Sequence, residues 1–166
     1  NPHFSPLVGW VHQKGETLFQ ENTRATEGIK QMAERGGTFI LVAELNSLID
    51  NGKGLSSYTA SGLSGGVGSI QTQIVVSKTF PSVSLATMLA PSPDWYVACV
   101  NVHLLDEQGD YVAEKTVIAH VYDAGTDSGA TFSASNSKTL PQEPIVKISQ
   151  PPLGNGNEVL PTLCMV

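Results

Sequence analysis

Short apolar runs separated by turn-forming residues are the feature that most constrains the fold of this chain. The turns between the runs are rich in glycine, proline, serine and aspartate, each of which favours tight turns for its own backbone reason. Runs with the character of strands occupy the ranges 4–13, 38–45, 69–79, 82–89, 95–105, 111–122 and 145–148. Many short strands with this punctuation predict an antiparallel β-sandwich.

One segment has helical instead of strand periodicity. Ile29, Met32 and Ala33 fall at helical spacing within residues 26–35, and Gly36 and Gly37 end the pattern. Residues 50–68 are rich in glycine and serine and predict a long loop. The chain shows no internal repeat and no linker, so residues 1–166 are expected to form a single domain.

Bulk charge excludes some functions. The 166 residues carry a formal net charge of −6 and no Lys/Arg cluster, which argues against a nucleic-acid partner. No apolar run approaches the roughly 18 residues that a membrane span needs. The chain opens at Asn1-Pro2 without a signal peptide, as expected for a processed mature form. Cys99 and Cys164 allow one disulfide or two thiols, and the sequence leaves both open.

An acidic turn follows one of the predicted strands. In the stretch Tyr122–Gly129, Asp123 and Asp127 stand on either side of Gly125, with the hydroxyl of Thr126 between them. Glycine permits a sharp turn with positive φ, and converging oxygen ligands suit a hard cation such as calcium. The same residues also form ordinary Asx turns with purely local hydrogen bonds. Both interpretations fit the residues alone.

Three strings of residues identify the chain as a member of a known family. They are His3–Gly9, Met88–Trp95 and Tyr122–Gly129, the last followed by Thr-Phe-Ser at 131–133 and by Leu-Pro-Gln at 140–142. Together they resemble the spondin N-terminal (F-spondin) domain, and the similarity spans nearly the whole chain.

The resemblance implies a fold and a metal. The fold is an all-β, eight-stranded antiparallel β-sandwich similar to a C2 domain, with one short helix and long loops. The resemblance also implies one calcium ion at the loop end of the sandwich, with Asp94, Asp123, Asp127 and the Tyr122 carbonyl as ligands. An ion that joins two distant loops is expected to stabilise the fold.

The resemblance implies a setting as well. In animals the family belongs to extracellular matrix proteins, in which the domain mediates adhesion, including integrin binding. This chain is expected to depart from those members as a lone domain, and it has Leu105 where they often carry cysteine. Integrin adhesion is therefore not expected of it.

A second metal site is suggested by Trp10, His12 and His103. Trp10 and His12 share one face of a strand, about 7 Å apart. The pattern resembles methanotroph surface copper-binding proteins of the MopE/CorA type, in which two histidines and a kynurenine made from tryptophan bind Cu(I). The sequence predicts His103 on a neighbouring strand, with its side chain on the face of Trp95, Val97, Cys99 and Asn101. His120 and His3 are weaker alternative ligands.

Two functions follow from these predictions. No Gly-x-Ser-x-Gly, Cys-x-x-Cys, His-Glu-x-x-His or phosphate-binding motif is present, so the chain is not expected to be an enzyme. The first function is copper capture or acquisition by a secreted or cell-surface protein, on the bacterial outer surface, with a cell-surface or outer-membrane component as partner. The second is a calcium-stabilised extracellular adhesion or matrix-binding module without copper. The chemical state of Trp10 separates the two.

Overall fold

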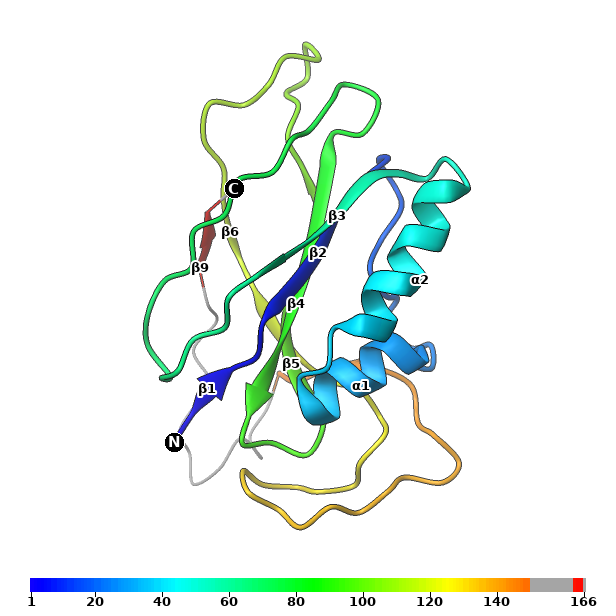
Figure 1. Cartoon of the computed structure of the whole chain (residues 1–166), viewed down its shortest axis with the longest axis vertical. Helices are drawn as coiled ribbons and strands as arrows, with labels where there is room; N and C mark the ends of the chain where they lie inside the picture. Colours follow the sequence, from blue (N-terminus) through cyan, green and yellow to red (C-terminus); the bar gives the residue numbers. More distant parts are fainter. Residues whose placement is uncertain (150–162, 166) are drawn as a thin grey trace.

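An antiparallel sheet of seven strands forms the centre of the molecule in the computed structural model, which describes residues 1–149 and the backbone of residues 163–165. The strands lie in the order β3-β2-β4-β5-β7-β8, and β1 pairs with one end of β4 (Figure 1). Their bounds are β1 (His3–Phe4), β2 (Leu7–His12), β3 (Gly54–Ala60), β4 (Ser82–Ala90), β5 (Trp95–His103), β7 (His120–Asp123) and β8 (Val146–Lys147).

Two helices, α1 (Glu27–Arg35) and α2 (Phe39–Asp50), cover one face of this sheet (Figure 1). The Thr26 hydroxyl caps the start of α1, and Gly36 ends it in the left-handed conformation, so the predicted helix is confirmed. A core of buried side chains fills the space between helices and sheet. It includes Val8, Trp10, Phe19, Ile29, Met32, Leu41, Leu45, Ala86, Tyr96 and Tyr122.

The other face of the sheet is covered mostly by chain without regular structure. A second core lies there, built from strand residues such as Val11, Val83, Trp95, Val97 and Cys99. Irregular segments contribute Ile74, Val76, Phe80, Val112 and Phe132 to it. Outside the main sheet, β6 (Thr116–Ile118) pairs with β9 (Leu163–Met165). The chain is therefore mostly antiparallel β, as predicted, but the structure does not confirm an eight-stranded sandwich.

Three local predictions were wrong. Residues 38–45 are not a strand, because Phe39–Asp50 forms α2 with Leu41 and Leu45 one helical turn apart on its buried side. Hydrophobicity alone does not distinguish an apolar run in a buried helix from an apolar run in a buried strand. The predicted loop contains β3, and no strand occurs within the predicted range 69–79.

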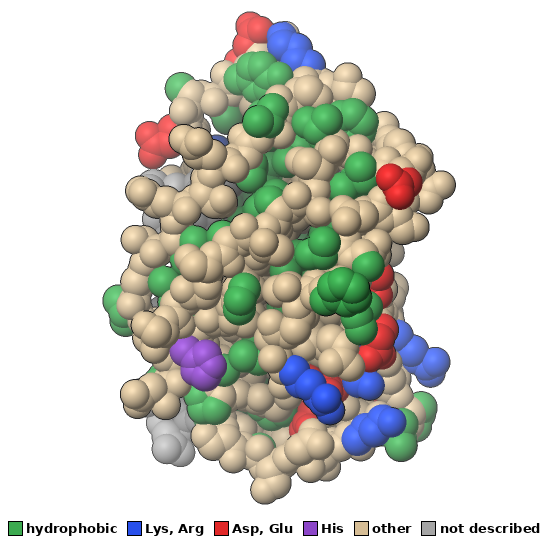
Figure 2. All heavy atoms as spheres, in the orientation of Figure 1, with side chains coloured by type: hydrophobic (Ala, Val, Ile, Leu, Met, Phe, Trp, Pro, Cys, Tyr) green, Lys and Arg blue, Asp and Glu red, His purple; other side chains and the backbone are tan. Residues whose placement is uncertain are grey.

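Three further features bear on predictions about the membrane, the surface charge and the cysteines. None of the helices within the described residues is long and apolar enough to cross a membrane. On the face shown in Figure 2, basic side chains lie among acidic ones and form no extended basic surface. Cys99 is buried on β5, whereas the side chain of Cys164 lies outside the described residues.

Candidate metal centre

Asp94 lies at the centre of the predicted calcium site. It stands at the turn between β4 and β5, directly before Trp95, and its side chain is completely buried. Its Oδ2 accepts hydrogen bonds from the Thr126 backbone N–H at 2.7 Å, the Thr126 hydroxyl at 3.2 Å and the Asp127 N–H at 3.0 Å. One carboxylate oxygen therefore fixes the acidic turn, 32 residues further along the chain.

The second oxygen of this carboxylate is the unusual one. Asp94 Oδ1 is buried and has no hydrogen-bond partner within the described residues. Burial, together with the nearby charge of Asp123, raises the pKa of Asp94 to about 6. Buried polar atoms are almost always paired, and a buried carboxylate is costly unless a positive charge or a proton compensates it. The orphaned oxygen therefore fits a bound cation.

Asp123 is the second acidic residue at this end of the sheet. It is the last residue of β7 and pairs with Trp95, the residue next to Asp94. Burial raises the pKa of Asp123 as well. Its Oδ1 accepts a hydrogen bond from the Gly125 N–H at 2.7 Å. Its Oδ2 takes no part in that bond. The strand pairing thus brings the buried carboxylate of Asp94 and the half-buried carboxylate of Asp123 to one sheet end.

Asp127 and Tyr122 contribute differently. Both oxygens of Asp127 accept backbone hydrogen bonds, from Gly129 at 2.8 Å and from Ser137 at 2.9 Å. Asp127 therefore ties the turn to the following loop, as in the alternative Asx-type interpretation. The Tyr122 ring points into the helix-side core, where it stacks on Tyr96 with 5.6 Å between ring centroids. Only its backbone carbonyl is a candidate ligand.

The donor set at this end of the sheet suits calcium in its chemistry. The candidate ligands are all oxygens, which hard divalent cations prefer. Within the part of the chain that the structure describes, no three His, Cys, Asp or Glu side chains converge in a geometry able to hold a metal. The orphaned oxygen of Asp94 and the nearby half-buried carboxylate of Asp123 fit a cation, and the ligand set stays a prediction.

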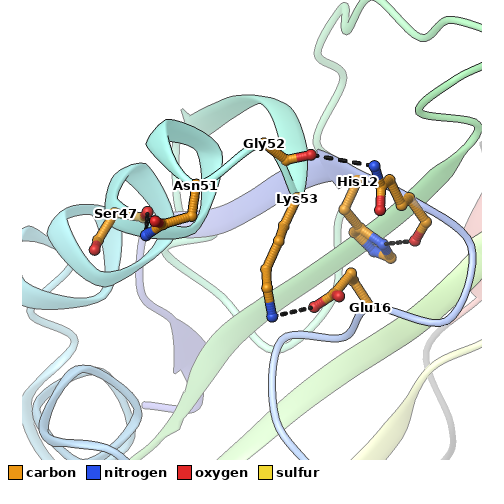
Figure 3. Close-up of polar contacts among 7 residues, drawn as sticks. His12, Glu16, Ser47, Asn51, Gly52 and Lys53 are labelled. Carbon is orange, nitrogen blue, oxygen red and sulfur yellow. Dashed lines mark hydrogen bonds and ion pairs between the residues drawn. The ribbon is translucent and has the colours of Figure 1, made fainter.

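The predicted copper residues Trp10 and His12 lie side by side, as expected from their shared strand face. Both side chains are fully buried, and their ring centroids are 4.7 Å apart. His12 Nδ1 donates to the Gln13 carbonyl at 2.8 Å, as Figure 3 shows. His12 Nε2 is 2.7 Å from the hydroxyl of Ser84, which also accepts the Asn101 N–H. Burial lowers the pKa of His12, so the neutral imidazole is favoured.

His103 is placed differently from the prediction. A bulge between β4 and β5, with Asn101 at a φ of 54°, shifts the alternation of side chains along β5. His103 therefore lies on the face opposite to Val102, which belongs to the second core, and shares the face of His12. The prediction that it shares the face of Trp95 was wrong.

The two histidines are also not on neighbouring strands. Ser82 of β4 pairs with His12 on one side and with His103 on the other, so a whole strand separates the two imidazoles. Adjacent strands are about 4.8 Å apart, which puts the two backbones about 10 Å apart. The Ser82 hydroxyl is 3.1 Å from His103 Nδ1. Each histidine is thus bonded to a serine of the strand between them.

The chain matches the Spondin_N family over residues 1–156. It belongs to the spondin N-terminal domain family. The human protein Spondin-2 is 32% identical over 151 residues, which cover 88% of this chain and 44% of that protein. Rat Spondin-1 is 31% identical over 147 residues, or 86% of this chain and 18% of that protein. The chain thus spans less than half the length of these relatives.

Some residues at the two sites were not foreseen from the sequence. Ser82 and Ser84 are fully buried and bond the two histidines, although they were seen only as part of a strand. The sequence pattern that could have identified them is a pair of serines two residues apart, which share one face of an otherwise apolar strand. Tyr96 is also buried, with a hydroxyl that has no partner within the described residues. Nothing in its local sequence indicates that environment.

Proposed function

We propose that this chain is an extracellular adhesion or matrix-binding module of the spondin type, stabilised by one calcium ion and without enzymatic activity. Family membership supports the class of protein. The observation that carries the metal is the orphaned and buried Oδ1 of Asp94, near the half-buried carboxylate of Asp123. The relatives are much longer than this chain, so the partner of the module is not carried over from them.

Calcium acts here on stability. The ion would be held by Asp94 and Asp123, with Asp127 and the Tyr122 carbonyl completing the predicted set. When bound it supplies a positive charge to offset the buried carboxylate of Asp94 and the half-buried carboxylate of Asp123. Asp94 already fixes the backbone of the acidic turn through Oδ2, so the ion and the turn stabilise each other. The expected result is a rigid loop end on the sheet, from which a matrix contact can be made.

The first test is the thermal stability of the protein with calcium and with the chelator EGTA. Calcium at a hundredfold excess over its dissociation constant should stabilise the fold by about 2.7 kcal/mol. For a domain of this size the melting temperature should then rise by about 5–10 °C.

The decisive variant for this test is Asp94→Asn. The Asn side chain keeps an acceptor for the turn and puts an amide in place of the orphaned oxygen, so the variant should fold but lose the calcium response. Asp50→Asn, at an exposed aspartate that ends α2, is the matched control and should keep the response. An equal calcium response in wild type and Asp94→Asn would disprove the site.

A second candidate function is Cu(I) capture at Trp10, His12 and His103. It is favoured by one observation, the buried indole N–H of Trp10, which has no hydrogen-bond partner within the described residues and lies against His12. The β5 bulge also puts all three residues on one face of the sheet. On this proposal dioxygen cleaves the C2–C3 bond of the Trp10 indole, and water then releases the C2 carbon as formate, which leaves kynurenine. His12 Nε2 leaves the Ser84 hydroxyl to bind the metal.

Intact mass, peptide mapping and elemental analysis of protein from its native host test the copper site. A gain of about 4 Da on the Trp10 peptide with about one copper per chain supports it. The substitutions His12→Gln and His103→Gln should then release copper, while His3→Gln, at the exposed N-terminal end, should not. Unmodified Trp10 with calcium alone would leave the adhesion module as the function.

A further inference from the structure

The strand β3 forms one edge of the seven-stranded sheet. It pairs with β2 on one side, and no other strand within the described residues pairs with it. Its regular register with β2 covers Ser56–Ala60, and Leu55 is the extra residue of a bulge before that segment. Among the described residues, Ser56, Ser57, Thr59 and Ala60 make no backbone hydrogen bond outside this pairing. The outer edge of β3 is therefore open to a further strand.

This edge lacks the features that usually keep an edge strand from pairing with another chain. Such strands often carry charged residues or proline. The sequence of β3, Gly-Leu-Ser-Ser-Tyr-Thr-Ala, contains neither. Lys53, directly before the strand, is paired with Glu16 at 3.5 Å (Figure 3). The bulge at Leu55 protects only the beginning of the edge, so the regular segment after it stays suitable for pairing.

One face of helix α2 continues the edge of β3. The exposed residues of α2 recur at helical spacing and are Phe39, Ala43, Asn46, Ser47 and Asp50. Asn46 joins this face to the strand, because its Oδ1 accepts a hydrogen bond from the Ser57 hydroxyl at 2.7 Å. Phe39 is 84% exposed, more than any other aromatic side chain among the exposed large hydrophobic residues of the described chain. The strand edge and the helix face thus form one surface.

This surface is nearly free of charge. Glu44 of α2 is directed to the start of α1, where it accepts hydrogen bonds from the Thr26 hydroxyl at 2.6 Å and the Gly28 N–H at 2.8 Å. Asp50 lies at the far end of the helix. Uncharged side chains occupy the middle of the view in Figure 2, which β3 crosses in Figure 1, and charged ones lie mostly towards the borders. Low charge and an exposed aromatic residue are typical of the core of a protein–protein interface.

We propose that this surface is the contact of a symmetric dimer, in which β3 of one copy pairs antiparallel with β3 of a second copy of this chain. The twofold axis of such a pair is perpendicular to the joined sheet, so the α2 helices of both copies lie on the same face of it.

A second copy suits this surface better than an isolated peptide does. An extended peptide would add a strand to β3 and would leave the α2 face with Phe39 exposed. A second copy brings its own α2 to the same side and can cover both parts. Each chain carries a net charge of −6, so two copies repel least where they meet through uncharged residues. Both β2 and β4 lie between this edge and β5, and the dimer does not depend on calcium.

The test is sedimentation equilibrium of the full chain between about 1 and about 200 μM protein, with calcium and with EGTA. We expect a reversible monomer–dimer equilibrium that is the same in both buffers, so a failure of the calcium proposal would leave it unchanged. Amide hydrogen exchange gives a second readout. Residues 56–60 should exchange more slowly at high protein concentration, because pairing with a second copy protects the outer amides of β3.

Two variants place a charge on the two parts of the surface. Ala43→Glu changes the helix face and Thr59→Lys changes the strand edge, and both positions are exposed, so both variants should keep the wild-type circular dichroism spectrum. Each should weaken the dimer at least about tenfold, since the core of an interface excludes charge. Leu140→Lys, at a residue that is 74% exposed between β7 and β8, is the matched control and should leave the dimer unchanged.

Three results would overturn the proposal. One is a monomer over the whole concentration range, which would leave the edge to an extended segment of a different protein. Another is a dimer that neither Ala43→Glu nor Thr59→Lys weakens, or that Leu140→Lys weakens equally. The third is a dimer in which exchange at residues 56–60 does not depend on protein concentration, because the two copies would then meet without pairing of β3.

Discussion

At the scale of single residues, Asp94 does two tasks with the two oxygens of one carboxylate. Oδ2 accepts three hydrogen bonds and holds the acidic turn, whereas Oδ1 is buried without a partner in the described structure. A purely structural turn would be served equally well by asparagine, which carries no buried charge. The buried carboxylate at this position is what indicates a cation.

The pH dependence of the calcium-free protein should expose this charge. Burial raises the pKa of Asp94 from 3.8 to about 6, so the folded state holds its proton at pH values where the unfolded state has lost it. This contribution to stability is complete below about pH 3.8 and is lost as the pH rises through about 6. The loss is about 3 kcal/mol at most.

Urea denaturation in EGTA between about pH 4 and about pH 7 measures this loss. Asp94→Asn should lack this part of the pH dependence, while the control Asp50→Asn should keep it. Added calcium should restore the lost stability of the wild type near neutral pH. Identical pH profiles for wild type and Asp94→Asn would show that folding does not raise the pKa of Asp94.

The sequence predicted that Asp94 and Asp123 belong to one cation site, but it did not predict the roles of the serines. Both aspartates occur in strings typical of the family, and their turn chemistry is local. The bonds from Ser82 and Ser84 to the two histidines depend on strand register and on a bulge, which no local pattern contains. The face of His103 was mispredicted for the same reason, because one extra residue on a strand reverses the alternation of every residue after it.

At the scale of structural elements, the acidic turn depends on one glycine. Gly125 has a φ of 71°, and a Cβ on it would lie 2.2 Å from the Glu143 carbonyl oxygen. Two chain segments therefore meet where no side chain fits. We expect Gly125→Ala to destabilise the fold by about 3 kcal/mol through strain and displacement of the loop, and to weaken calcium binding.

Gly109→Ala is the control for this substitution. Gly109 has a similar φ of 81°, but a Cβ there would meet nothing within 4 Å. It should show only the backbone cost, about 1 kcal/mol, and leave calcium binding unchanged. Urea denaturation and a calcium titration of both variants provide the comparison. If the two variants lose equal stability, the close approach of Gly125 to Glu143 does not contribute to the destabilisation by Gly125→Ala.

Helix α2 shows where element prediction fails in this chain. Its sequence is apolar nearly throughout, so a buried strand and a buried helix fit equally well over residues 38–45. The tertiary structure decides, because Leu41 and Leu45 pack onto the sheet from one side of a helix. By contrast α1 has an amphipathic pattern, a threonine cap and a terminal glycine, and its prediction was correct.

At the scale of the whole molecule, the sheet is a regular antiparallel array of strands, whereas the chain that covers one of its faces is mostly irregular. The predicted strands at 82–89 and 95–105 agree with β4 and β5, which pair side by side in the middle of the sheet. The opposite layer is mainly irregular chain that packs Ile74, Val76, Phe80 and Phe132 onto the second core. Apolar residues in that layer resemble a strand in their pattern, which explains the strand expected at 69–79.

This organisation predicts that calcium removal opens one part of the molecule before the rest. The chain between Ala124 and Ile145 lies at the loop end and is joined to the sheet through the acidic turn, by hydrogen bonds such as Ser137 N–H to Asp127 and Glu143 N–H to the Gly125 carbonyl. Repulsion between the carboxylates without calcium should loosen these bonds while leaving the strand residues of both cores packed.

Trypsin measures this opening at the exposed Lys138, which pairs with Asp127 in the loop. In EGTA we expect cleavage after Lys138 to become about tenfold faster, as a loss of about 1.4 kcal/mol of local stability would cause. Cleavage after Arg35, at the end of α1, should be unchanged and serves as the internal control. In Asp94→Asn, cleavage after Lys138 should be independent of EGTA. If cleavage at both sites accelerates together, calcium stabilises the whole fold cooperatively and the loop end has no separate opening.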